Sequence, residues 1–356
     1  MKYWVVGYYG YGNTGDDDLL TQTIKVIRSA DTAATISIAF PIHPRSPLPQ
    51  DTHPIHRFSP YQVIRAVWNA DAVIFGGGGI FQDQTSIQSL LYYVSIVMLA
   101  ASLRRPVFLL GQGISKPKRK ISGYLIKLAL ARCHWIGCRD HESLAELRKM
   151  LTPTAGTLTA DLAFAFRTAT LHPGHRPYVA LSVRHPNQPL NWAPLQHFIN
   201  HSSYPIIGLS FEAPQDDLAI QYLFDTTTKT APSIIAINTQ FPKADLASGV
   251  PELVIAMRYH ACVWAALNGI PFLAIAYDDK VIAIAQELGQ PVMDLRHTNP
   301  PPSLSIAVAA AIQNQASLKA QLCQTLPGLS RRALINQEGI SDFVRDSGCR
   351  NKREPN

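Results

Sequence analysis

Short apolar runs alternate along the chain with glycine-rich corners and longer amphipathic segments. In the N-terminal half this pattern predicts strands at residues 3–7, 72–75, 107–110 and 134–138, and helices at 17–29, 86–104, 118–132 and 141–150. Strands that alternate with helices of this length form right-handed βαβ units around a parallel sheet. The first half is therefore predicted to be a Rossmann-like domain.

The same alternation resumes after residues 166–177, a polar segment with one glycine and two prolines. Here the pattern predicts strands at residues 178–183, 206–209, 233–237, 253–256 and 271–276, and helices at 216–226, 261–268, 280–288 and 303–325. We therefore expect an α/β protein with two Rossmann-like domains, residues 1–167 and 176–328, that face each other across a cleft. Residues 329–356 are predicted to form a helix that packs back on the first domain, and a basic tail.

Residues 41–60 are rich in proline and histidine and show no periodicity. We predict an irregular connection there. A metal site on His43, His53 and His56 is the less favoured alternative.

Composition describes an ordinary globular protein with a preference for anions. The chain has 356 residues, a hydrophobic content of 47% and a charged content of 16%, which fit two packed domains. Its formal charge is +7, with small basic clusters at residues 116–127 and 345–353 and no nucleic-acid motif. An anionic small ligand is therefore favoured over nucleic acid, and a peripheral contact with a membrane surface stays open.

The cysteines and the apolar segments predict a cytoplasmic protein. The five cysteines have no CxxC spacing, which is typical of reduced thiols without a zinc site. No secretory signal is visible at the N-terminus. The longest apolar stretch, residues 90–103, is shorter than the roughly 20 residues of a membrane span, so we predict a buried helix.

The segment around residue 258 carries the strongest chemical signal. Arg258 and His260 stand two residues apart at the head of an apolar run, and Lys280 follows the next predicted strand. Two fixed positive charges and one imidazole at the ends of adjacent elements can hold a small polyanion and move a proton near it. The alternative is structural: Arg258 pairs with Asp278 or Glu252, and His260 caps the helix.

Glycine-rich corners follow three predicted strands, where open parallel sheets bind ligands. Each corner either contacts an anion or a sugar hydroxyl, or serves only as a helix cap or tight turn. Three aspartates in a row follow the first corner and would repel a phosphate, which argues against a nicotinamide or flavin cofactor. The candidate contacts in and after these corners are Asn13, Asp16, Gly77, Gly78, Gln82, Asp83 and Gln112.

Two further arginines end predicted strands. Arg139 precedes Asp140, so it forms either a salt bridge or an anion contact. Arg184 ends the first strand of the second domain and is predicted to face the cleft, where it contacts phosphate or acceptor.

Together these motifs resemble the polysaccharide pyruvyl transferase family, in particular the bacterial cell-wall enzymes. The resemblance rests on the ordered set of residues 7–16, 76–83, 111–114, 138–143 and 257–280, and it extends from about residue 3 to about residue 290. It implies a fold like that of glycosyltransferases of the B class. It also implies transfer of pyruvate from phosphoenolpyruvate to a glycan as a cyclic ketal, without metal or cofactor. Three successive aspartates, Asp16 to Asp18, and Leu162 after Asp161 depart from the family pattern, which weakens the acceptor-site assignment most.

The resemblance also implies roles for individual residues. His260 would be the general acid, and Arg258, Arg139, Lys280 and Arg184 would bind the donor. The glycine-rich corners of the first domain would then bind the acceptor, either lipid-linked or free. Two alternatives remain: a nucleotide-sugar glycosyltransferase of the same architecture, and a relative that only binds glycans.

Overall fold

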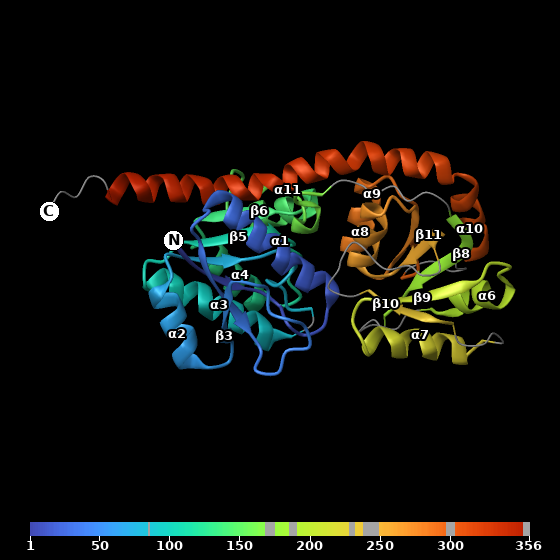
Figure 1. Cartoon of the computed structure of the whole chain (residues 1–356), viewed down its shortest axis with the longest axis horizontal. Coiled ribbons are helices and arrows are strands. Elements are labelled where there is room, and N and C mark those ends of the chain that lie inside the picture. The colour runs from blue at the N-terminus through green and yellow to red at the C-terminus, as the bar shows by residue number, and fades with distance from the viewer. Residues whose placement is uncertain are drawn as a thin grey trace. The chain divides into compact units, whose positions relative to one another are not determined.

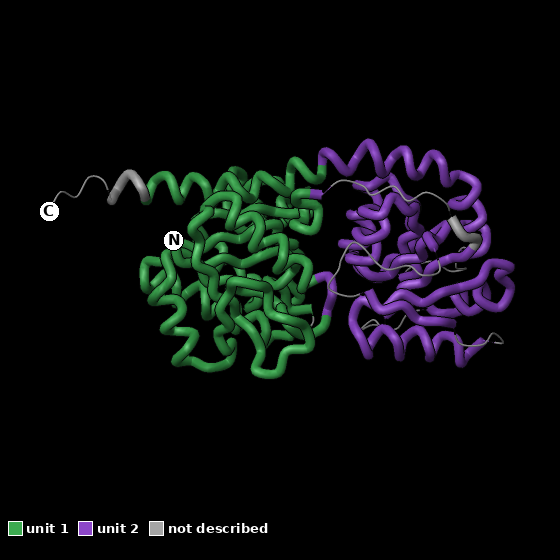
Figure 2. Tube along the Cα trace, in the orientation of Figure 1, with its two compact units in different colours: residues 1–12, 16–166, 329–356 green, residues 13–15, 167–328 purple. Residues whose placement is uncertain are grey.

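The computed structural model describes residues 1–84, 86–167, 175–184, 191–227, 232–237, 249–296 and 303–351 (Figure 1). The chain divides into two compact units (Figure 2). Unit 1 comprises residues 1–12, 16–166 and 329–356, and unit 2 comprises residues 13–15 and 167–328. Each unit is built around its own parallel sheet.

Unit 1 holds a seven-stranded parallel sheet in the order β3-β2-β1-β4-β5-β6-β7. Its elements are β1 (Lys2–Val6), α1 (Thr14–Ala30), β2 (Thr35–Phe40), β3 (Thr52–His56), α2 (Pro60–Asn69), β4 (Ala72–Phe75), α3 (Ile87–Ser102), β5 (Val107–Gln112), α4 (Lys120–Leu130), β6 (Trp135–Cys138), α5 (His141–Met150), β7 (Thr157–Leu158) and the short 3-10 helix Leu162–Phe164. The direction of winding reverses between β1 and β4. Sheets of this kind bind ligands at the carboxyl ends of the strands at such a switch point.

Helices cover both faces of this sheet. On one face α2, α3 and α4 bury apolar side chains such as Val67, Val97 and Ile126 against the strand residues Phe75 and Leu109. The central strands are apolar on both sides, as expected for a parallel sheet between two helical layers. Residues 90–103, predicted to form a buried helix, lie within α3 and its C-cap, and α3 buries one side of its surface.

Unit 2 repeats the arrangement with a six-stranded parallel sheet in the order β10-β9-β8-β11-β12-β13. Its elements are β8 (His175–Ser182), α6 (Ala193–His201), β9 (Ile206–Ser210), α7 (Gln215–Asp225), β10 (Ile234–Ala236), β11 (Val250–Ala256), α8 (Tyr259–Leu267), β12 (Phe272–Ala276), α9 (Asp279–Glu287), β13 (Val292–Asp294), α10 (Leu304–Gln313) and the first part of α11 (Gln315–Asn351). Here the switch point lies between β8 and β11. The prediction of two Rossmann-like α/β domains is confirmed.

The last helix, α11, contributes to both units. Its residues from Leu329 onward belong to unit 1. There the Phe343 ring lies 5.4 Å from that of Phe108, and Asn336 Oδ1 accepts the Gly111 N–H at 2.9 Å. This part of α11 therefore packs on the strand β5.

Several local predictions were wrong. Residues 41–60 are not wholly irregular, because strand β3 lies within them and pairs with β2. Helices α2 and α6 were not predicted, and the helix expected at 303–325 is interrupted at Asn314, where α10 ends and α11 begins. Residues 168–174, in the predicted connection between domains, lie outside the described part of the chain.

Candidate active site

Charged side chains follow the carboxyl ends of four neighbouring strands in unit 2. Ser182 of β8 and Ala256 of β11 are register partners, so Arg184 and Arg258 stand two residues beyond paired positions on adjacent strands. Glu212 follows β9, and Lys280 lies in the first turn of α9, after β12. These residues therefore gather at the switch point of the unit 2 sheet, where ligands bind in this architecture.

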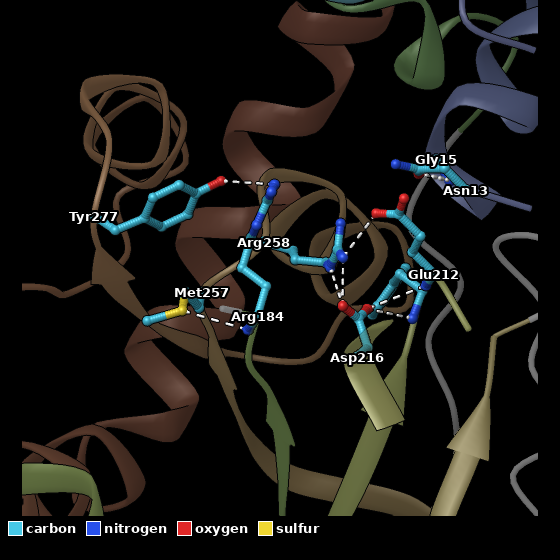
Figure 3. Close-up of polar contacts among 9 residues, drawn as sticks. Asn13, Gly15, Arg184, Glu212, Asp216, Met257, Arg258 and Tyr277 are labelled. Carbon is cyan, nitrogen blue, oxygen red and sulfur yellow. Dashed lines mark hydrogen bonds and ion pairs between the residues drawn. The ribbon is translucent and has the colours of Figure 1, made fainter. Parts of the chain in front are cut away.

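Arg258 is held by two carboxylates. It occupies the N-cap of α8, and its Nε donates to Asp216 Oδ1 at 2.8 Å and its Nη2 to Glu212 Oε2 at 2.9 Å (Figure 3). Asp216 is fully buried and also accepts the Phe211 N–H at 2.9 Å. Burial by itself would lower the pKa of Arg258, but Asp216 and Glu212 raise it above the ordinary value, so the guanidinium stays charged.

The partners of Arg258 differ from those considered in the structural alternative, Asp278 and Glu252. Asp216 and Glu212 come from the start of α7 and the end of β9 instead. Its positive charge is therefore already balanced. Within the described chain only its Nη1 makes no hydrogen bond, so this edge of the guanidinium is open to a further acceptor.

Arg184 and Lys280 share one aromatic ring. Arg184 Nη1 lies 3.5 Å from the Tyr277 hydroxyl, and its guanidinium carbon lies 5.6 Å from the ring centroid (Figure 3). Lys280 Nζ lies 5.7 Å from the same centroid and 3.3 Å from Asp278 Oδ2. No carboxylate of the described residues pairs with Arg184, and its buried Nε has no hydrogen-bond partner there. Of the two switch-point arginines, Arg184 is thus the one that has no carboxylate partner within the described part of the chain.

His260 lies in the first turn of α8 and packs closely against Gly15. Its ring meets that of Tyr259 edge-on, with centroids 5.3 Å apart. A Cβ added at Gly15 would lie 2.1 Å from the His260 Cγ. Only glycine leaves room for the imidazole in this position.

Residues 13–15 belong to unit 2 although they come from the N-terminal glycine-rich corner. The Thr14 N–H donates to the Phe211 carbonyl at 2.9 Å, and Asn13 forms an antiparallel bridge with Glu212. Asn13 Oδ1 accepts the Gly15 N–H at 3.1 Å, a turn-stabilising contact (Figure 3). Asn13, a predicted acceptor contact, therefore lies with the residues predicted to bind the donor.

In unit 1 the glycine-rich corners at the ends of β1 and β4 close around Tyr9. A Cβ at Gly7 would lie 2.2 Å from the Tyr9 ring, and one at Gly76 would lie 2.2 Å from its hydroxyl. Gly78 has a φ of 107°, which an L side chain rarely adopts, and its carbonyl accepts the Gly113 N–H at 2.9 Å. The corners therefore bring three backbone segments close together.

Gln112 and Asp83, two predicted acceptor contacts, hold backbone. The fully buried Gln112 donates through Nε2 to the Gly76 carbonyl. The two oxygens of Asp83 accept the N–H groups of Lys118 and Arg119 at 2.8 and 3.0 Å. Burial would raise the pKa of Asp83, but the hydrogen bond from Lys118 N–H and others lower it overall, so the carboxylate stays ionised.

The other predicted acceptor residues sit around the same corners. Asp16 lies beside Gly78, since a Cβ at Gly78 would be 3.8 Å from its Oδ1. Gln82 accepts the Gln84 N–H. Gly77 packs on Leu19, which would lie 3.0 Å from an added Cβ. Of these three, the half-buried Asp16 offers the clearest polar group next to a glycine corner.

Arg139 forms a salt bridge with Asp140, one of the two alternatives that the sequence allowed. Its Nε lies 2.9 Å from Asp140 Oδ2, and its guanidinium carbon would lie 2.6 Å from a Cβ at Gly113. Burial would raise the pKa of Asp140, but Arg139 and the hydrogen bonds from Ser143 lower it. Arg139 thus lies flat against the corner after β5, in unit 1, while the other predicted donor residues are in unit 2.

The predicted site residues fall into two groups. Unit 2 brings together Asn13, Arg184, Arg258, His260 and Lys280, and unit 1 brings together Asp16, Gly77, Gly78, Gln82, Asp83, Gln112 and Arg139. Sequence reasoning missed Glu212, Asp216 and the roles of Gly15 and Tyr277. Gly15 and Tyr277 stand inside the motifs, but no spacing links Asp216 to Arg258, 42 residues later.

The described residues contain no cluster of three or more His, Cys, Asp or Glu side chains that could hold a metal ion. In the same residues, no helix combines the length and the apolar character that crossing a bilayer requires.

Comparison with solved structures supports the fold. Similar structures include Anabaena HepE in complex with UDP-glucose, with a TM-score of 0.62, 11% identity, and coverage of 97% of this chain and 100% of that one. Sucrose-phosphate synthase from Thermosynechococcus elongatus has a TM-score of 0.61, 10% identity, and coverage of 98% and 99%. UDP-GlcNAc 2-epimerase from Neisseria meningitidis, bound to UDP-GlcNAc, has a TM-score of 0.58, 10% identity, and coverage of 96% and 99%. At these identities the likeness shows a glycosyltransferase-B-like fold.

Comparison of sequences identifies the family. No curated protein matches the chain. The family model described as polysaccharide pyruvyl transferase matches residues 13–279, which include every glycine-rich corner from Asn13 onward and the segment from Arg258 to Asp279. The chain therefore belongs to the polysaccharide pyruvyl transferase family, and it is a transferase that acts on polysaccharide.

Proposed function

We propose that this protein transfers pyruvate from phosphoenolpyruvate to a sugar of a cell-surface or cell-wall glycan, as a cyclic ketal, and releases phosphate. The observation that carries the proposal is the cluster at the unit 2 switch point in a chain of this family. Arg184, without a carboxylate partner in the described chain, lies with Lys280 around Tyr277. Phosphoenolpyruvate carries about three negative charges, which a guanidinium and an ammonium group are suited to hold.

The proposed reaction needs one proton donor. Protonation of the methylene carbon makes C2 electrophilic, a sugar hydroxyl attacks C2, and the bond from C2 to the phosphate oxygen breaks. A second hydroxyl then closes the ketal. Of the two hydroxyl protons, one balances the proton gained by the new methyl group and the other leaves with phosphate, so no metal or redox cofactor is consumed.

His260 is our candidate for the general acid. An imidazole titrates near neutral pH, which suits proton transfer at working pH. Its packing against Gly15 restricts where the ring can move, since even a methyl group at that position would overlap it. A proton donor that is held in place accelerates a reaction more than a mobile one.

The remaining predicted donor residues take narrower roles in this proposal. Arg258 offers the donor its Nη1 edge, while Asp216 and Glu212 hold the rest of its guanidinium. Arg139 lies in unit 1 and is paired with Asp140, so we propose that it contacts the donor carboxylate or phosphate without leaving that pair. The unit 1 corners, with Asp16, Gly78 and Gln82, are proposed to bind the acceptor sugar.

We place the reaction in the cytoplasm, peripheral to the membrane face where glycans are assembled. The acceptor sugar is either lipid-linked or free in this proposal. A panel of lipid-linked and free oligosaccharides, each incubated with phosphoenolpyruvate and the full chain, would identify it by phosphate release.

The donor assignment is tested by Arg184→Met. We expect phosphoenolpyruvate to raise the thermal midpoint of the wild-type protein, and we expect its affinity to fall about 10–100-fold in the variant, the loss for a charged hydrogen bond. Arg331→Met, at an exposed position of α11, is the matched control and should bind normally. Equal binding by all three proteins would refute the role of Arg184.

A nucleotide-sugar glycosyltransferase is the second candidate, because HepE, which has a similar fold, was solved in complex with UDP-glucose. In that case the same cations would hold a diphosphate. Stabilisation by UDP or GDP, together with none by phosphoenolpyruvate, would favour this candidate over pyruvyl transfer.

A further inference from the structure

The outer surface of unit 1 on the side of α2, α3 and α4 combines exposed aromatic and aliphatic side chains with lysines and arginines. These three helices pack side by side on one face of the sheet, with α3 against both neighbours (Figure 1). We call the exposed side chains of these helices and of residues 116–119 the basic face.

The apolar members of this face point to solvent at helical spacing. On α2 the exposed residues Tyr61, Ile64 and Trp68 stand at positions i, i+3 and i+7, and Trp68 is 62% exposed. On α4, Ile121 and Tyr124 are 57% and 64% exposed. Apolar side chains that gather on the exposed side of one helical layer are typical of surfaces that contact a partner or a membrane.

The charges of this face have one sign. The sequence from residue 84 to residue 139 contains nine Lys or Arg and no Asp or Glu, and α2 contains Arg65 and no acid. Lys116, Lys118, Arg119, Lys120 and Lys127 are all exposed. On the same side of the sheet α5 carries Glu142 and Glu146 as well as Arg148 and Lys149, so the one-sided charge is confined to α2, α4 and residues 116–119.

We infer that the basic face docks the protein on a membrane surface with anionic lipid headgroups. Lysines and arginines are attracted to such a surface, and tryptophan and tyrosine side chains sit at its interface with one end apolar and one end wet. Because α2, α3 and α4 carry no carboxylate, these helices themselves do not repel such a surface. Charge complementarity and interfacial aromatic groups thus point to the same occupant.

The basic face is tied to the proposed acceptor corners. Asp83 follows the corner at residues 76–79 and accepts the N–H groups of Lys118 and Arg119. The helices of the face begin at the carboxyl edge of the sheet, the edge that carries these corners. Docking by this face would therefore bring those corners close to the bilayer, where a lipid-linked glycan is presented. Only this last step depends on the proposed function.

The test is co-sedimentation of the full chain with vesicles of phosphatidylcholine alone or with phosphatidylglycerol added. We expect the wild-type protein to bind only the vesicles that contain phosphatidylglycerol. Each lysine removed should lower the partition coefficient about fivefold, so the double variant Lys120→Glu, Lys127→Glu should lose at least about 25-fold. The matched control is Lys25→Glu, Arg331→Glu, which reverses two exposed charges on α1 and α11. It should bind like the wild type.

Tryptophan fluorescence locates the contact. Trp4 and Trp264 are buried and Trp135 and Trp192 are half-buried, so most of a blue shift on vesicle binding should come from the exposed Trp68. We expect Trp68→Phe to bind vesicles but lose most of the shift, and Trp68→Ser to bind severalfold more weakly. Circular dichroism would establish that each variant is folded.

Three outcomes would overturn the inference. In the first, the folded wild-type protein does not bind anionic vesicles. In the second, the control variant loses as much vesicle binding as the Lys120→Glu, Lys127→Glu variant. In the third, the protein binds RNA in a salt-sensitive way that the variants of the basic face abolish, and it does not bind lipid. None of these measurements requires turnover, so pyruvyl transfer and membrane docking can fail separately.

Discussion

Six strands follow the same order in both units, and unit 1 adds β7, but the residues at the carboxyl ends of these strands differ. In unit 1 the order β3-β2-β1-β4-β5-β6 ends in glycine corners, and the polar side chains there, Asp83 and Gln112, hold backbone groups. In unit 2 the order β10-β9-β8-β11-β12-β13 ends in Arg184, Arg258 and Lys280. Apart from Arg139, which follows β6 and pairs with Asp140, the strand ends of unit 1 thus carry glycine corners where those of unit 2 carry basic side chains.

This contrast shows that the position of a switch point follows from topology, while its chemistry follows from a few residues just beyond the strands. Changes in unit 2 should affect donor binding and proton transfer. Changes in the unit 1 corners should affect stability and the use of the acceptor.

The largest expected effect is that of His260→Asn in unit 2. If His260 is the general acid, ketal formation should slow by about 10²–10⁴-fold while phosphoenolpyruvate still binds. Phosphate release under single-turnover conditions measures the rate, and thermal stabilisation measures binding. A variant that turns over at the wild-type rate would remove His260 from this role.

Next in size is the effect of Arg258→Met on folding. The change leaves Asp216 buried and without its charged partner, so the free energy of unfolding should fall by about 3–5 kcal/mol. Lys280→Met is the control, because its ion pair with Asp278 is partly exposed and should contribute about 1 kcal/mol or less. Urea titration measures the free energy of unfolding of both variants. Similar losses would contradict the view that Arg258, unlike Lys280, stabilises the fold.

Gly15→Ala should impair catalysis more than folding. The added methyl group would lie 2.1 Å from the His260 ring, so the imidazole must move, and a displacement of about 1 Å can cost roughly 10²-fold in rate. Gly328→Ala, in helix α11 and outside the proposed site, is the matched change, because a Cβ added there would meet no neighbouring atom within 4 Å. Steady-state rates with phosphoenolpyruvate should fall in the first variant and stay unchanged in the second.

The smallest expected effect comes from Asp83→Asn in unit 1 and depends on pH. Because folding lowers the pKa of Asp83, its carboxylate stabilises the fold above the ordinary value of 3.8, and this contribution disappears as the pH falls through the folded pKa. The variant should lose about 1.5–3 kcal/mol at pH 7 and nothing at strongly acid pH. Asp51→Asn, at an exposed carboxylate, should show no such difference in urea titrations.

Much of the fold could be predicted because buried parallel strands leave continuous apolar runs. Residues 72–75 form β4 with the predicted bounds, and residues 141–150 form α5 in the same way. Strand β3 escaped prediction because its sequence, Thr52–His56, contains a proline and two histidines in place of an apolar run. It lies at the edge of the sheet, where half of its hydrogen-bonding groups have no neighbouring strand and a proline is tolerated.

The site could be predicted only in part. Arg258, His260 and Lys280 stand within one motif, so their spacing marks them as candidates, and their roles stay predictions. The carboxylates that hold Arg258 could not be found in this way, because Glu212 and Asp216 approach it only when β9 and β11 lie in the same sheet. A charge count from sequence therefore overestimates the positive charge available to a ligand.

Asn13, Thr14 and Gly15 limit how the protein can be divided into fragments. They lie more than 150 residues before the rest of unit 2, yet Thr14 donates to the carbonyls of Phe211 and Ile237 there. A gene fragment that encodes residues 167–328 alone would leave both carbonyls without these donors, and it would remove the neighbour that confines His260. Domain swaps between relatives should for this reason carry the tripeptide along with the C-terminal half.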